Sequence, residues 1–286
     1  MKLLLIQERG RHEKNRNFRE CENFKRSFQR LGVECEIWGL GYDNFNVSFS
    51  EIVKDKDIIF SIENYDSGWT PDLSQYSDKL KIFWSVDSHC ALPSHLKTVI
   101  KNKFNIVLNS IESHQEYFKN YSKTFYFPNA YPNDLIYPKE HIEKKYDVGF
   151  CGSLISDRQA WLEFLSKYFS IKKDIFVIGE EMVDAICSYK LAFNKTLADD
   201  INYRVFETLG CKTALITNKP SGIEKFFIDD KHIIYYSNTD ELKEKILYYL
   251  NNQEKLKEIS LNGYNEAISK HTYDVRAKQF LELLGE

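Results

Sequence analysis

Short apolar runs alternate with amphipathic segments through the first part of the chain. In the segment 17–31, the apolar residues from Phe18 to Leu31 fall at helical spacing, and Gly32 follows where a helix would end. The pattern predicts strands at residues 2–7, 35–40, 57–62, 81–86, 105–109 and 124–127, and helices at 17–31, 93–101 and 110–121. Strands that alternate with helices or long crossovers are typical of parallel sheets whose faces are covered by helices.

The alternation starts again after a segment rich in proline. Residues 128–145 carry three prolines and a charged tail, which is typical of a linker. Beyond it, strands are expected at 146–151, 175–178, 191–194, 213–217 and 233–236, and helices at 157–168, 182–188, 239–251, 253–270 and 273–284, with a further helix opened by Asp199 and Asp200. The whole pattern predicts an α/β protein with two Rossmann-like domains that face one another across a cleft.

Composition narrows the class of protein without naming a function. The chain has 286 residues, a formal charge of −3 and six cysteines. The charge gives no support to a general polyanion-binding role, and the cysteines form no C-x-x-C pair, which favours free thiols in a reducing compartment. The sequence has no run of about 18 apolar residues and no secretory cleavage pattern, so we expect a cytoplasmic protein without a membrane span.

Polar residues on the helix after the strand 191–194 are the first candidates for chemistry. Ile201, Val205 and Leu209 form one apolar stripe, so Asn202, Arg204 and Glu207 must point elsewhere. A carboxylate at this place can accept hydrogen bonds from ribose hydroxyls, and an arginine can neutralise phosphate. The alternative is a surface pair between Arg204 and Glu207 that stabilises the helix by a few tenths of a kcal/mol.

Two further groups of residues could contact the same ligand. Gly152 and Ser153 follow a predicted strand, and Arg158 begins the next predicted helix, where a guanidinium can reach a diphosphate. A plain connection between strand and helix explains these residues equally well. Lys190 and Asn194 lie upstream of the central helix and could contact phosphate or base, although lysines near strand ends are usually only solvated.

In the first half, Asp87 and His89 follow the predicted strand 81–86. They would lie at the carboxyl end of a parallel sheet, where ligands bind. Either side chain could bind a sugar or act as an acid or base, or both could belong to a polar, capped turn. Together with Glu63 they are not spaced like a dedicated metal site.

The stretch around residue 204 resembles the nucleotide-binding segment of GT-B glycosyltransferases, in the branch with spore-maturation-type proteins. That branch carries an N-x-R-x-F-E motif, which stands here as Asn202, Arg204, Phe206 and Glu207. Asp199 matches in position the first acid of a paired acidic motif of the broader retaining group. The family also shows a similar G-S…R segment and, more weakly, the W-x-x-D-x-H pattern of Trp84, Asp87 and His89. The chain departs at Lys212, where relatives commonly have glycine.

The resemblance implies transfer of a sugar from a UDP- or GDP-linked donor to an acceptor hydroxyl, with retention, no metal and no cofactor. It implies an acceptor-side domain at 1–143, a donor-binding domain at 144–270, and a C-terminal helix at 271–286 that crosses back to the first domain. Catalytic candidates are Asp87, His89 and Asp199. Donor-binding candidates are Gly152, Ser153, Arg158, Lys190, Asn194, Asn202, Arg204 and Glu207, with Glu207 on the ribose and the two arginines on the diphosphate.

Other functions remain open at this point. A sugar-nucleotide epimerase or phosphorylase can use the same fold, and the departure at Lys212 is compatible with a catalytically silent protein that binds sugar nucleotides or acts as a scaffold. The acceptor could be a protein, a lipid-linked glycan, a small molecule or a modified DNA base. The sequence does not indicate the oligomeric state.

Overall fold

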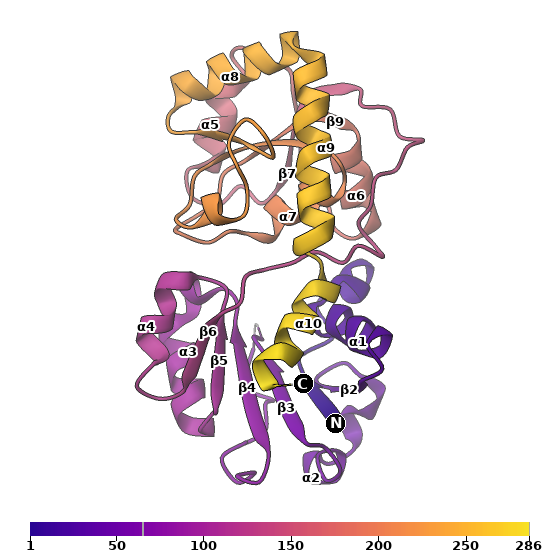
Figure 1. The fold of residues 1–286 in the computed structure, drawn as a ribbon, viewed down its shortest axis with the longest axis vertical. Helices are drawn as coiled ribbons and strands as arrows, with labels where there is room; N and C mark the ends of the chain where they lie inside the picture. Colours follow the sequence, from indigo (N-terminus) through magenta and orange to yellow (C-terminus); the bar gives the residue numbers. More distant parts are fainter. Residues whose placement is uncertain (65, 286) are drawn as a thin grey trace. The chain divides into compact units, whose positions relative to one another are not determined.

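The computed structural model describes residues 1–64 and 66–285 (Figure 1). Tyr65 and Glu286, the last residue of the predicted segment 271–286, lie outside the described residues. The chain forms two compact units: Met1–Asn129 joined by Arg276–Glu286, and Ala130–Val275. Each unit is built around one parallel β-sheet, so the predicted α/β class is confirmed.

The first unit contains a six-stranded parallel sheet with the order β2-β1-β3-β4-β5-β6. Its strands are β1 (Lys2–Ile6), β2 (Glu34–Trp38), β3 (Ile58–Ile62), β4 (Leu80–Ser85), β5 (Ile106–Asn109) and β6 (Lys123–Tyr126). After β1 the chain moves outward to β2, and it then returns past β1 to place β3 and the later strands on the other side. The boundary between β1 and β3 is therefore the topological switch point, where open α/β sheets bind ligands.

Helices cover both faces of this sheet (Figure 1). The helices of the first unit are η1 (Glu13–Phe18), α1 (Glu20–Arg30), η2 (Asp43–Asn46), α2 (Phe49–Ile52), α3 (Ser88–Asn102), η3 (Glu112–His114), α4 (Gln115–Phe118) and most of α10 (Tyr273–Leu284). The ring of Phe280 in α10 packs on Phe28 of α1 and Phe60 of β3, at centroid distances of 5.3 and 4.7 Å. The Arg276 guanidinium is buried and donates to the Pro128 and Asn129 carbonyls. The last helix thus completes the core of the first unit.

The second unit contains a five-stranded parallel sheet with the order β11-β10-β9-β7-β8. Its strands are β7 (Tyr146–Gly152), β8 (Ile171–Ile175), β9 (Tyr189–Asn194), β10 (Ala214–Asn218) and β11 (Ile234–Tyr236). Its helices are α5 (Arg158–Leu165), α6 (Glu180–Cys187), α7 (Tyr203–Gly210), η4 (Ile223–Lys225), α8 (Thr239–Asn251) and α9 (Gln253–Lys270). The chain proceeds from β7 to β8 on one side of β7, and then returns to place β9, β10 and β11 on its other side. The switch point of this sheet therefore lies between β7 and β9.

Two predicted elements of the second unit are wrong. The strand expected at 175–178 lies earlier, at Ile171–Ile175, and Phe176 is 77% exposed with a φ of 57°. Because β8 is an edge strand, its residues are only partly buried, and the more apolar residues after it form the following loop instead. The central helix begins at Tyr203 and not at Asp199, because its N-cap residue Asn202 has extended backbone angles, with a ψ of 162°, outside helical geometry.

Two predicted helices of the first unit also differ from the observed ones. Helix α3 begins at Ser88 with Asp87 as its N-cap, so Pro93 lies inside the helix and not at its start. Proline favours the first helical position, because within a helix it removes one hydrogen bond and its ring crowds the carbonyl four residues earlier, which is why the sequence pattern placed Pro93 at the start. The helix expected at 110–121 divides into the short η3 and α4.

Lys212 takes the backbone conformation that a glycine would take. Its φ is 52°, in the left-handed region, and its carbonyl accepts a hydrogen bond from Ser260 Oγ at 2.7 Å. The turn between α7 and β10 therefore has a conformation that a glycine would adopt without strain. The conformation costs a side-chain-bearing residue about 1–2 kcal/mol.

We expect Lys212→Gly to increase the free energy of unfolding by about 0.5–1 kcal/mol, because relief of the backbone strain exceeds the entropy cost of a glycine. Lys212→Ala is the matched control, since it removes the lysine side chain but keeps the strain, and it should give no comparable gain. Urea unfolding of the three proteins measures the difference. Equal stability of the Gly and Ala variants would contradict the strain at this turn.

Candidate functional site

Arg158 joins the two strand ends at the switch point of the second unit. Its Nε donates to the Lys195 carbonyl at 2.9 Å, just beyond β9, and its Nη1 donates to the Ser153 carbonyl at 3.2 Å, just beyond β7. Gly152, the last residue of β7, has a φ of 156°, which side-chain-bearing residues rarely adopt. The structure thus places Gly152, Ser153 and Arg158 together at the edge where ligands bind in such sheets.

Arg204 and Glu207 face the same region from α7. Their side chains form an ion pair at 3.0 Å and are 19% and 17% exposed. The contact does not have hydrogen-bond geometry, so the buried Nη1 of Arg204 has no hydrogen-bond partner among the described residues. The pair between residues i and i+3 is present, but it is largely buried and not the solvated surface pair of the alternative interpretation.

The two arginines create an excess of positive charge. Burial, followed by repulsion from Arg204, lowers the pKa of the Arg158 guanidinium. Two guanidiniums that repel one another in a partly buried place are stabilised when an anion lies between them, and phosphate matches their paired donors. The electrostatics of this edge therefore favour a phosphate-containing ligand.

Asn202 occupies the N-cap position of α7 without capping the helix through its side chain. Its Oδ1 is buried and has no hydrogen-bond partner among the described residues. Buried polar atoms are nearly always paired, with protein, water or ligand. The amide oxygen is therefore available to a donor group on a bound molecule.

Three other candidates have different surroundings. Lys190 lies near the amino end of β9, at the opposite edge of the sheet, and its Nζ contacts Asp147 Oδ1 at 2.7 Å. The Asn194 amide is buried and donates to Thr217 Oγ1 at 3.1 Å, within the sheet. Asp199 is exposed and accepts the Ser221 N–H at 3.3 Å. The structure does not bring Lys190 together with the arginines.

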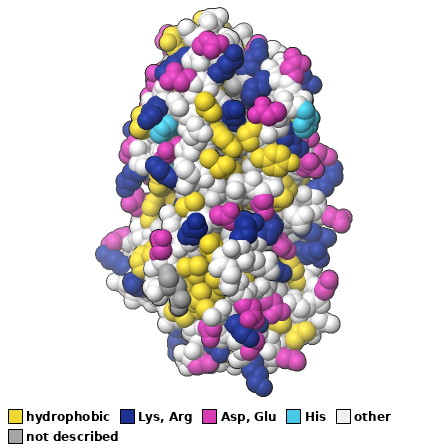
Figure 2. Space-filling view, turned by 45° about the vertical axis from the view of Figure 1, so that its right-hand side comes forward, with side chains coloured by type: hydrophobic (Ala, Val, Ile, Leu, Met, Phe, Trp, Pro, Cys, Tyr) yellow, Lys and Arg dark blue, Asp and Glu magenta, His cyan; other side chains and the backbone are white. Residues whose placement is uncertain are grey.

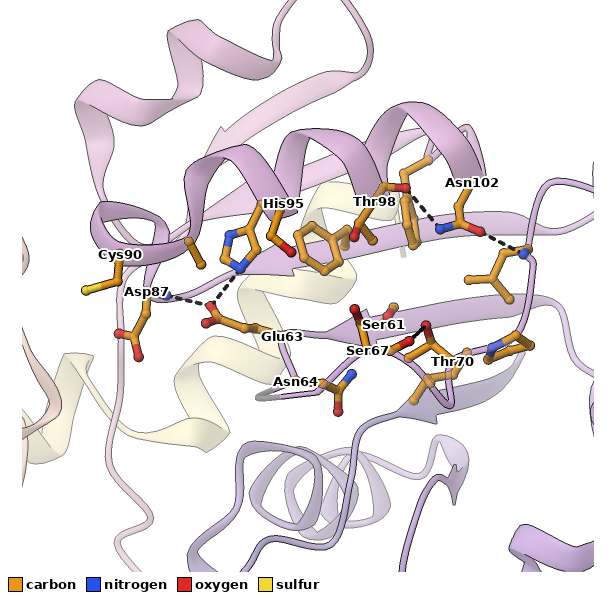
Figure 3. A pocket seen from close by; sticks show the side chains of 17 residues that line it. Ser61, Glu63, Asn64, Ser67, Thr70, Asp87, Cys90, His95, Thr98 and Asn102 are labelled. Atoms are coloured by element: carbon orange, nitrogen blue, oxygen red, sulfur yellow. Dashed lines mark hydrogen bonds and ion pairs between the residues drawn. The ribbon is translucent and has the colours of Figure 1, made fainter.

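The first unit places Asp87 beside a carboxylate network at the carboxyl end of its sheet. Glu63 Oε2 accepts the backbone N–H groups of Val86 and Asp87 at 2.9 and 2.6 Å. His95 Nε2 lies 3.4 Å from the same oxygen (Figure 3). His95 Nδ1 contacts Ser85 Oγ at 2.8 Å. Glu63 thereby fixes the backbone from which Asp87 extends.

The environment changes the acidity of Asp87 and the basicity of His89. Burial, followed by the charges of Glu63 and Glu20, raises the pKa of Asp87 to about 6. Burial lowers the pKa of His89, so its imidazole is neutral near pH 7. A carboxylate with a pKa near the working pH is suited to accept a proton.

Sequence reasoning did not select Glu63 and His95 as site residues. Glu63 directly follows β3, and Asp87 follows β4 after one intervening residue. The position of Glu63 after a buried strand could therefore have identified it as a candidate site residue, as it did for Asp87. His95 could not be found in this way, because its role depends on how α3 packs against the strands.

The surface adds two observations. On the face drawn in Figure 2, basic and acidic side chains are interspersed and form no broad patch of one sign. Within the described residues, no helix combines the length and apolar character that a membrane-crossing segment needs.

Residues 137–282, slightly more than half of the chain, match the profile of a family described as glycosyl transferase-like. A search of curated proteins found no match. Similar solved structures include alpha-glucosyltransferase (AGT) in complex with UDP, Anabaena HepE in complex with UDP and glucose, and sucrose-phosphate synthase from Thermosynechococcus elongatus. AGT is 12% identical with a TM-score of 0.72, and the alignment covers 100% of both chains. HepE is 12% identical with a TM-score of 0.69, and the alignment covers 100% of this chain and 99% of HepE. Sucrose-phosphate synthase is 11% identical with a TM-score of 0.69, and the alignment covers 99% of this chain and 98% of the synthase. The fold is that of GT-B glycosyltransferase structures.

We expect Asp87→Asn to stabilise the protein at pH 7.5 by about 1–2 kcal/mol and to have little such effect at pH 4. The pKa of Asp87 is raised on folding, so its favourable contribution is complete below the ordinary value of 3.8 and is lost as pH rises through about 6. Urea unfolding at both pH values measures the difference. Asp78→Asn, at an exposed site, is the control, and an equal effect of Asp87→Asn at both pH values would contradict the buried charge.

Proposed function

The chain belongs to the glycosyl transferase-like family, and from this we propose that it transfers a sugar from a nucleotide-sugar donor to an acceptor hydroxyl, with retention and without a metal ion. The observation that carries the proposal is the pair of arginines at the switch point of the second unit, next to one carboxylate. A nucleoside diphosphate matches this arrangement, because its phosphates can receive donors from Arg158 and Arg204 and its ribose hydroxyls can donate to the Glu207 carboxylate.

Each donor-side residue has a distinct proposed role. Gly152 and Ser153 let the diphosphate approach the backbone, and Arg158 and Arg204 neutralise its charge. Glu207 accepts hydrogen bonds from the ribose, and Asn202 and Asp199 lie nearer the transferred sugar. The HepE structures are described with UDP and UDP-glucose, and AGT with UDP, which supports a UDP-linked donor over a GDP-linked one.

The arginines also support chemistry without a metal ion. When the bond between the anomeric carbon and the diphosphate breaks, negative charge develops on the leaving oxygen, and two fixed guanidiniums stabilise it. The N-x-R-x-F-E motif supports retention and a place in the spore-maturation-type branch.

We assign residues 1–143 to the acceptor side, 144–270 to the donor side, and 271–286 to the helix that returns to the first domain. In the reaction, the acceptor oxygen forms a bond to the anomeric carbon and its proton passes to Asp87, whose pKa of about 6 suits this task. Glu63 is a positioning residue for Asp87, and neutral His89 orients the acceptor or the sugar.

The experiment that tests the function is a screen of nucleotide sugars by thermal unfolding, combined with mass detection of released nucleotide. We expect a UDP-linked sugar to raise the melting temperature by several degrees, because a ligand at 100 times its Kd stabilises by about 2.7 kcal/mol. Nucleotide release should continue in EDTA. No response to any UDP- or GDP-linked sugar would contradict the proposed donor, and activity that is lost in EDTA and restored by Mg²⁺ would contradict metal independence.

Glu207→Gln should weaken UDP binding by about 1.5–3 kcal/mol, the range for a hydrogen bond to a charged group. Calorimetric titration with UDP measures the loss, and a melting curve confirms that the variant is folded. Glu163→Gln, an exposed position on α5 of the same unit, should bind UDP as the wild type does. Unchanged affinity of folded Glu207→Gln would remove Glu207 from the donor site.

A further inference from the structure

A cavity of about 480 Å³ lies in the first unit between α3 and the sheet, and it extends from the strand ends at the switch point to Asn102 at the end of α3 (Figure 3). Ile6 ends β1, Ser61 lies near the end of β3 and Glu63 follows it, so the lining spans the boundary between β1 and β3. The volume falls within the range of about 300–1,000 Å³ that small-molecule sites occupy. Both the position and the size are those of a ligand site.

The lining combines apolar walls with available hydroxyl groups. Phe83, Phe104 and Leu73 provide the apolar surface. The hydroxyls of Ser61 and Thr98, and of Ser94 at the exposed mouth, make no hydrogen bond to other described residues. A molecule with an apolar face and a polar edge fits both features. A sugar ring has this character, because its C–H groups form a face and its hydroxyls form the rim.

Charge in the cavity is unevenly distributed. Glu63 and Asp87 lie at one end and Asn102 at the other, and no lysine or arginine is among the described residues that line it (Figure 3). Lys81 lies behind the Asn102 end, but its Nζ donates to the carbonyls of Leu73 and Asn102, at 3.1 and 2.8 Å. His95 also lines the cavity and lies 3.4 Å from Glu63 Oε2, whereas the Asp87 carboxylate makes no ion pair with another described residue. A partly buried carboxylate of this kind repels an anion and attracts a neutral or cationic partner.

We propose that this cavity binds the acceptor, and that the acceptor is an uncharged or amine-bearing carbohydrate and not a phosphorylated or carboxylated one. The inference rests on the proposed glycosyl transfer and specifies its second substrate. The apolar walls contact the face of the sugar ring, Ser61, Ser94 and Thr98 bond its hydroxyls, and Asp87 accepts a hydrogen bond from a hydroxyl or an amine.

Ligand-observed NMR on the full chain without donor tests the proposal, with glucose, N-acetylglucosamine, glucosamine and glucose 6-phosphate as probes. We expect at least one of the first three to bind, and glucose 6-phosphate to bind at least tenfold more weakly than its parent sugar or not at all. Ser94→Leu narrows the mouth of the cavity and should abolish the binding. Thr98→Val keeps the side-chain shape, removes one hydroxyl, and should weaken binding by about threefold to tenfold.

Lys97→Leu is the matched control, because it adds a leucine to an exposed position of the same helix outside the lining. It should bind the probes as the wild type does. UDP binding, measured separately, should be unchanged in all three variants. Failure of wild-type UDP binding would overturn the donor proposal. If UDP binds normally, three results would overturn the acceptor proposal alone: no saccharide binds, glucose 6-phosphate binds better than its parent sugar, or Ser94→Leu binds the saccharides as the wild type does.

Discussion

The contact between Gly149 and Tyr189 determines the geometry of the second unit. A Cβ atom at Gly149 would lie 2.2 Å from the Tyr189 ring, so only glycine leaves room for this ring where β7 and β9 pair. The Tyr189 hydroxyl bonds Asp174 of β8, which connects three strands through one side chain. Because β7 and β9 border the switch point, this contact also sets the distance that Arg158 bridges between their ends.

The two switch points carry different charged groups. The one in the second unit presents Arg158 and the ion pair of Arg204 with Glu207, whereas the one in the first unit presents Asp87, the contact of Glu63 with His95, and several hydroxyls. Parallel sheets supply the same kind of edge in both units, and the loops after the strands supply the difference. The difference between the two edges therefore depends on a few residues after the strands and not on the fold.

The sequence pattern predicted the two parallel sheets because buried strands and amphipathic helices are recognisable from spacing alone. It failed at β8, where an edge strand is only partly buried, and at the start of α7, where the extended backbone of Asn202 has no signature in composition. Among candidate site residues, Arg158, Arg204 and Glu207 converge as their places after strands predicted. Lys190 does not join them, because it lies at the amino end of β9, and the two ends of one strand lie at opposite edges of the sheet. The contact of Glu63 with His95 depends on how α3 packs against the strands, which residue spacing in the sequence does not indicate.

The return of α10 to the first unit has a consequence for the order of folding. Phe280 belongs to the aromatic core that also contains Phe28 and Phe60, so the first unit lacks part of its core until nearly the whole chain has been synthesised. The second unit is continuous from Ala130 to Val275 and contains all its own strands. During synthesis, the second unit can therefore complete its core first, and the first unit completes its core only after α10 has left the ribosome.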